Sequence, residues 1–147
     1  MSNLVVHFEI HASEPQRLID FYSALLGWRF SRYGEMEYWG IDTGEGSIGV
    51  DRPTGGGING GLVPRIGPRP EVGAPINGAG VVVALDGSVD EVFARGVVLG
   101  ATEALAPADM PGVGRLAYLV DPDGNVFGLL SAVLSDGTTV SMGGGEG

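Results

Sequence analysis

The chain has 147 residues, a formal net charge of −10 at pH 7 and no cysteine. All eight of its basic residues are arginines and form no basic stripe, so we expect no binding to nucleic acid or to an anionic membrane. Without cysteine there are no disulfides or thiolate metal sites. The sequence has neither the long apolar run of a membrane span nor the start of a signal peptide, so we expect a cytoplasmic protein.

The chain begins with the pattern of a half-buried strand. Over residues 4–10 apolar and polar residues alternate, which places Phe8 and Ile10 on one face and His7 and Glu9 on the other.

A helix is predicted to follow this strand. Ser13 and Gln16 have the spacing of a capping box, and Pro15 between them is tolerated in the first turn of a helix. An apolar stripe then runs to about Leu26, where Gly27 provides a natural stop. Short strands are predicted next at residues 28–33, 38–42, 47–51 and 58–63.

The second half of the chain repeats this order after a Gly- and Pro-rich connection at residues 64–77. An apolar strand at 81–85 precedes a second capping box, formed by Ser88 and Glu91, and a second apolar helical stripe. A strand at 116–120, a tight turn at 121–125 and a strand at 126–130 then form a hairpin.

The two capping boxes begin 75 residues apart (88 − 13), which indicates an internal duplication. We predict module one at about residues 4–65 and module two at about 78–133, within a single domain covering residues 1–142 and followed by a disordered tail at 143–147. The alternative is an ordinary α+β domain whose two helices happen to start alike.

Each half carries a set of short motifs. The first half has His-Phe-Glu-Ile at 7–10, Ile-Asp-Phe-Tyr at 19–22 and Leu-Gly-Trp at 26–28, and the second half has Pro-Gly-Val-Gly at 111–114, Tyr-Leu-Val-Asp-Pro-Asp-Gly-Asn at 118–125 and Gly-Leu at 128–129. In this order the motifs resemble those of the vicinal oxygen chelate superfamily, which includes glyoxalase I, bleomycin-resistance proteins and extradiol dioxygenases. The resemblance implies an α+β fold of two βαβββ modules that form a curved mixed sheet with a central cavity, and it implies a homodimer.

The resemblance also implies where a divalent metal would bind: near the start of each module and on each module's last strand. His7 occupies the first of these positions, whereas its counterpart falls at Gly80 or Val82 and the closing carboxylate position falls at Gly128. On the last strand of module one only Asn59 has a coordinating side chain. We therefore expect no metal cofactor, with His7 the only retained ligand; a divalent metal in a rearranged site is the alternative.

His7 and Glu9 are the leading site candidates, because they point the same way about 7 Å apart along their strand. They could contact a ligand or exchange a proton, with Glu9 as the candidate catalytic residue, or they could simply satisfy each other within the sheet.

Four further side chains could line the cavity: Trp39, Asn59, Arg115 and Tyr118. For Tyr38, Trp39 and Tyr118 the alternative is core packing or a dimer contact, and for Arg115 it is a solvated surface position. Asp121 and Asp123 look like a carboxylate pair for acid–base chemistry, but turn formation explains both.

These observations favour a glyoxalase/bleomycin-resistance-like protein that binds a small organic molecule without the usual metal. One alternative is a metal-dependent lyase, isomerase or dioxygenase with a rearranged site around His7 and Glu9. The other is a structural or interaction domain whose cavity is filled by its own side chains.

Overall fold

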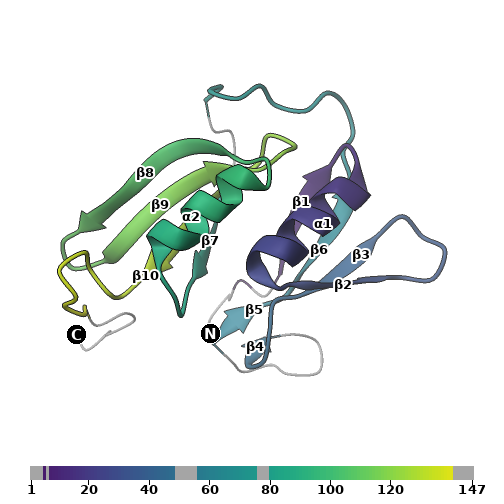
Figure 1. Cartoon of the computed structure of the whole chain (residues 1–147). Coiled ribbons are helices and arrows are strands. Elements are labelled where there is room, and N and C mark those ends of the chain that lie inside the picture. Colours follow the sequence, from purple (N-terminus) through teal and green to yellow (C-terminus); the bar gives the residue numbers. More distant parts are fainter. Residues whose placement is uncertain (1–4, 6, 49–55, 76–79, 141–147) are drawn as a thin grey trace. The chain divides into compact units, whose positions relative to one another are not determined.

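The computed structural model describes Val5 and residues 7–48, 56–75 and 80–140, which divide into two compact units, Met1–Pro70 and Glu71–Gly147 (Figure 1). The tail expected to be disordered, residues 143–147, lies outside the described part of the chain. Among the described residues, no helix has the length and hydropathy needed to cross a membrane.

The N-terminal unit is a four-stranded mixed sheet with one long helix. Its elements are β1 (Phe8–Ala12), α1 (Pro15–Leu26), β2 (Arg29–Arg32), β3 (Trp39–Asp42), β4 (Ser47–Ile48), β5 (Gly57–Ile58) and β6 (Gly60–Pro64). The strands lie in the order β1-β6-β3-β2, with β1 and β6 parallel and the other neighbours antiparallel. The short strands β4 and β5 form a separate parallel pair.

The C-terminal unit repeats this topology. Its elements are β7 (Val81–Ala84), α2 (Val89–Val98), β8 (Thr102–Met110), β9 (Gly114–Val120) and β10 (Val126–Ser131). The strand order β7-β10-β9-β8, with β7 and β10 parallel, matches that of the first sheet strand for strand. The predicted α+β fold of two βαβββ modules is therefore confirmed.

Each sheet buries one face against its helix. In the N-terminal unit the buried side of α1 carries Leu18, Phe21, Tyr22 and Leu25. Ile10 and Ala12 of β1 are buried, while Glu9 and His11, which alternate with them, are exposed, as the alternation in the sequence predicts. We call the face of this sheet that carries Glu9 the open face.

Ring contacts place Phe8 on the helix side of the same sheet. Trp28, which follows α1, stacks on Tyr22 of the helix with ring centroids 5.2 Å apart, and its ring lies 5.8 Å from that of Phe8. These contacts tie the first strand to the helix that follows it.

The helix caps were predicted with mixed success. Ser88 caps α2 by accepting a hydrogen bond from the backbone N–H of Glu91, and Gly27 ends α1 with a φ of 73°, both as expected. The first capping box is wrong: the N-cap of α1 is Glu14, which makes no side-chain cap hydrogen bond, and not Ser13. Pro15 starts the helix one residue later than the capping box implies.

Two strand predictions also need correction. The single strand expected at 58–63 is split at Asn59 into β5 and β6. Strand β8 was not located at all, because its alanines and Pro107 give no β-like pattern. An edge strand with register shifts tolerates proline, since its outer N–H groups need no partner in the sheet.

Candidate functional site

The open face of the N-terminal sheet brings three polar side chains together. His7 precedes β1, Glu9 lies within it, and Tyr38 directly precedes β3. The imidazole Nε2 of His7 lies 3.4 Å from Oε2 of Glu9 and 3.2 Å from the hydroxyl of Tyr38. The His7 and Glu9 side chains are 46% and 42% exposed, so the group is accessible to solvent.

Glycines on the inner strands make room for two tyrosine rings on this face. Gly61 of β6 pairs with Glu9 on one side and with Gly40 of β3 on the other. A Cβ at Gly61 would overlap the Tyr38 phenol, and a Cβ at Gly40 would lie only 3.0 Å from the Tyr33 ring. The Tyr38 phenol can therefore lie against β6 only because Gly61 lacks a side chain, whereas a side chain at Gly40 would require the Tyr33 ring to shift.

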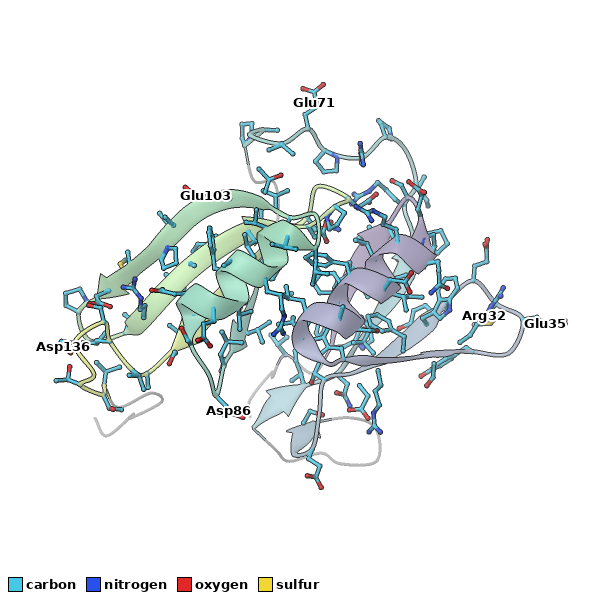
Figure 2. All side chains as sticks on the ribbon, in the orientation of Figure 1. Arg32, Glu35, Glu71, Asp86, Glu103 and Asp136 are labelled. Carbon is cyan, nitrogen blue, oxygen red and sulfur yellow. The ribbon has the colours of Figure 1, made fainter. Side chains whose placement is uncertain are left out.

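The two tyrosine rings contact each other edge to face. The Tyr33 and Tyr38 centroids are 5.1 Å apart with an interplanar angle of 71°. Tyr33 directly follows β2, and its backbone N–H donates to the Tyr38 carbonyl, so the two residues face each other across the β2–β3 hairpin at the start of the turn whose tip carries Glu35 (Figure 2). We call His7, Glu9, Tyr33 and Tyr38 the open-face cluster.

The cluster favours the protonated form of its phenol. Burial, the negative charge of Glu9, the neighbouring Tyr33 and a hydrogen bond with Glu9 all raise the pKa of Tyr38 above 10.0, and burial is the largest cause. At neutral pH Tyr38 is therefore a hydrogen-bond donor beside a carboxylate acceptor. The arrangement can bind a polar group of a ligand through both, and it can pass a proton between them.

Trp39, a predicted ligand contact, lies on the other face of the same sheet. It pairs with Leu62, which is fully buried and pairs in turn with Ile10 on the helix side. The Arg32 guanidinium lies 5.3 Å from the Trp39 ring centroid (Figure 2 labels Arg32). The pleat therefore separates Trp39 from His7 and Glu9 and puts Tyr38 beside them instead.

Asn59 organises loops within the N-terminal unit. Its Oδ1 accepts hydrogen bonds from the Thr43 backbone N–H at 2.9 Å and from the Ser47 hydroxyl at 2.8 Å. The Thr43 hydroxyl lies 3.2 Å from the same oxygen. The side-chain oxygen that we considered for metal binding thus joins the turn after β3 to the junction of β5 and β6.

The two candidates of the C-terminal unit lie on opposite faces of its sheet. Arg115 forms ion pairs with Asp90 of α2 at 2.9 Å and Asp109 of β8 at 3.0 Å, and only 19% of its side chain is exposed. Tyr118 pairs with Gly128 of β10, and a Cβ at Gly128 would lie 2.8 Å from the Tyr118 ring. Arg115 therefore has protein partners on the helix side, whereas Tyr118 covers a glycine on the face away from α2.

Asp109 is the centre of a polar network at this edge of the sheet. The Ser135 hydroxyl and backbone N–H both donate to its carboxylate, and Arg115 ion-pairs with it. These contacts lower the pKa of Asp109 below 3.8, with the Ser135 hydroxyl as the largest cause.

The turn at Asp121 is also as predicted, because its carboxylate accepts from the backbone N–H of Asp123 and Asn125.

The strand registers show which residues occupy the positions where a metal was considered. Gly61 pairs with Glu9 in the first unit, and Gly128 pairs with Val82 in the second, so the two glycines are equivalent positions of the last strands. Neither offers a side-chain donor, and each lies under a tyrosine ring. In the part of the chain that the structure describes, no three His, Cys, Asp or Glu side chains gather as a metal would require.

Comparisons with known proteins identify the family. A family model described as a glyoxalase-like domain matches residues 6–130. Comparison with curated protein sequences gives no match.

Three similar solved structures come from bacteria. A glyoxalase/bleomycin resistance protein/dioxygenase family enzyme from Burkholderia phytofirmans PsJN is 18% identical, with a TM-score of 0.62 over 85% of this chain and 95% of the other. A glyoxalase-related enzyme from Fulvimarina pelagi is 14% identical, with a TM-score of 0.64 over 96% and 99%. The fosfomycin resistance protein FosX from Mesorhizobium loti is 15% identical, with a TM-score of 0.59 over 92% and 97%. At these identities the likeness shows the fold.

Proposed function

Because the chain belongs to the glyoxalase-like domain family, we propose that it binds a small organic molecule on the open face of the N-terminal sheet, without a divalent metal. The observation that carries this proposal is the open-face cluster, in which Glu9, His7 and Tyr38 lie within 3.4 Å of a neighbour and remain accessible. Function in this fold resides in the site and differs between relatives, so the proposal rests on these side chains.

The side-chain donors of the cluster support the metal-free part of the proposal. His7 and Glu9 supply one nitrogen and one carboxylate, fewer than the three protein ligands of a typical catalytic zinc site. The last-strand positions, Gly61 and Gly128, hold glycines under phenol rings. A phenol donor and a carboxylate acceptor bind a polar organic group directly, as small-molecule sites commonly do.

A thermal-shift screen of small organic compounds tests the proposal, since a ligand that binds only the folded state raises the melting temperature. Hits should lose their shift in Glu9→Gln and Tyr38→Phe. Glu71→Gln, which makes the same charge change at an exposed residue whose side chain points into solvent (Figure 2), should leave it unchanged. Hits that survive both cluster substitutions would contradict the proposed location.

Elemental analysis after exposure to divalent metal tests the second part. Stoichiometric bound metal that is lost in His7→Ala would contradict metal-free binding and restore the metal-dependent lyase, isomerase or dioxygenase alternative. The wild-type protein should instead retain no such metal after dialysis.

A proton-transfer enzyme is the second candidate function. It is favoured by one observation, the Tyr38 phenol held protonated within hydrogen-bond reach of His7. In such an enzyme Tyr38 would donate a proton to bound substrate and Glu9 would accept one. NMR spectra of screening hits incubated with the protein should then show conversion that Tyr38→Phe abolishes; hits recovered unchanged would favour simple binding.

A further inference from the structure

The charge of the ligand can be inferred from the composition of the open-face cluster. Building on the proposed function, we propose that the ligand carries an organic cation, such as a substituted ammonium group, held by the carboxylate of Glu9 and the rings of Tyr33 and Tyr38. This names a ligand class for the site and assigns Tyr33 to it.

Glu9 offers an accessible carboxylate that no arginine in the described part of the chain neutralises. Its contacts within the described residues are with His7 and Tyr38, and no arginine there ion-pairs with it. Arg29 instead ion-pairs with Asp42 at 3.0 Å, and Arg32 lies over Trp39 on the opposite face. A ligand cation could therefore approach the carboxylate from solvent without displacing the guanidinium of any described arginine.

The two tyrosines add an aromatic surface next to this charge. Tyr33 is 56% exposed, and its ring meets that of Tyr38 at 71°, so the rings form a corner and not a flat stack. The electron-rich face of an aromatic ring attracts cations, and a carboxylate beside it adds to that attraction. Because Gly40 and Gly61 have no side chains, the two rings lie close to the strands and beside Glu9.

The same features disfavour the other ligand charges. An anionic group would approach a carboxylate in a chain whose net charge is −10, which repels it at long range and at contact. A neutral ligand would cover Glu9 without supplying an opposite charge, and desolvating an unpaired carboxylate is costly. Among monovalent organic groups, only a cation gains from both the acid and the rings.

Three aromatic probes of similar size separate these possibilities: benzyltrimethylammonium, benzyl alcohol and phenylacetate. Binding to the full chain is measured by protein-observed NMR titration, with chemical shift changes mapped to the cluster. We expect the cation to bind about tenfold more tightly than either other probe. This factor corresponds to the combined binding free energy of one exposed ion pair and one or two cation–π contacts.

Variants identify the groups responsible. Glu9→Gln should weaken binding of the cation about threefold to fivefold, and Glu71→Gln, with the same loss of charge, should not. Tyr33→Leu should weaken binding by a similar factor, whereas Tyr33→Phe, which keeps the aromatic ring, should retain it. Because Glu9 and Tyr33 are both exposed, neither substitution removes a core contact, and the NMR spectrum of each variant confirms that it is folded.

Each other outcome overturns the inference in a recognisable way. If benzyl alcohol or phenylacetate binds at the cluster as tightly as the cation, the ligand class is wrong and the proposed site stands. If none of the probes binds while hits from the thermal-shift screen map to the cluster, the same conclusion holds. If neither the probes nor the screen perturbs these residues, both the ligand class and the proposed function are wrong.

Discussion

Substituting Gly61 with alanine tests how the open-face cluster is held in place. Gly61 is not among the glycines with positive φ, so alanine fits its backbone, but the added Cβ would overlap the Tyr38 phenol. Overpacking of this kind costs about 1–3 kcal/mol, and replacing a strand glycine recovers about 0.5–1 kcal/mol. We therefore expect Gly61→Ala to destabilise the protein by about 1–2 kcal/mol.

A double-mutant cycle isolates the contact between Gly61 and Tyr38. In a Tyr38→Ala background the ring is gone, so Gly61→Ala should stabilise the protein by about 0.5–1 kcal/mol. Urea denaturation followed by circular dichroism gives the free energy of unfolding of all four proteins. The expected coupling energy, about 1.5–3 kcal/mol, lies within the range seen for residues in direct contact.

The matched control is Gly57→Ala in β5, where an added Cβ meets nothing within 4 Å. This substitution should be neutral or slightly stabilising in either background. If Gly61→Ala changes the free energy of unfolding equally with and without the Tyr38 ring, the ring does not lie over that glycine and our description of the cluster is wrong.

Three further predictions concern the charge and capping of single residues. Glu9→Gln should lower the pKa of Tyr38 in an ultraviolet titration but leave it above 10.0, because burial is the largest cause of the shift. A return of the pKa to its ordinary value would show that Glu9, and not burial, is the main cause. The contacts that depress the pKa of Asp109 stabilise the folded state above pH about 4 and are lost as the pH falls through the lowered value. Denaturation curves of wild type and Asp109→Asn should accordingly converge below pH 3.8, and a difference independent of pH would show that charge plays no part. Ser88→Ala should cost about 1 kcal/mol in urea denaturation, whereas Glu14→Ala, at a cap without a side-chain hydrogen bond, should cost less; equal losses would contradict the cap assignment.

Several features of the fold could be predicted because they depend on local pattern alone. The alternation around Glu9 identified the two faces of β1. Ser88 marked the start of a helix through its side-chain hydroxyl, and Gly27 marked the end of one through the positive φ that glycine tolerates. The repeated order of strands and helix followed from such local signals in both halves. The pairing of His7 with Glu9 was also predictable, since residues two apart on a strand share a face.

The rest of the site depends on long-range register, which the sequence does not reveal. The sequence does not show whether Tyr38 or its neighbour Trp39 lies on the open face. The pairing of Trp39 with Leu62 places Trp39 on the helix side and Tyr38 on the open face. Tyr33 was not predicted to belong to the site, because no local pattern shows that its ring packs on Gly40. The contact of Tyr38 with Gly61 joins residues 23 positions apart (61 − 38), and it depends on the pairing of β3 with β6, which the sequence does not reveal.

The position of the last strand in each sheet has a consequence for synthesis. Since β6 separates β1 from β3, the first strand has no neighbour in its sheet until Pro64 has left the ribosome, and its pairing of Phe8 with Gly60 spans 52 residues (60 − 8). Such distant pairing is slow compared with forming a helix or a hairpin. During synthesis of the N-terminal half we therefore expect α1 and the β2–β3 hairpin to form before β1 can join the sheet. In the second half β7 likewise has no partner in its sheet until β10 has been synthesised.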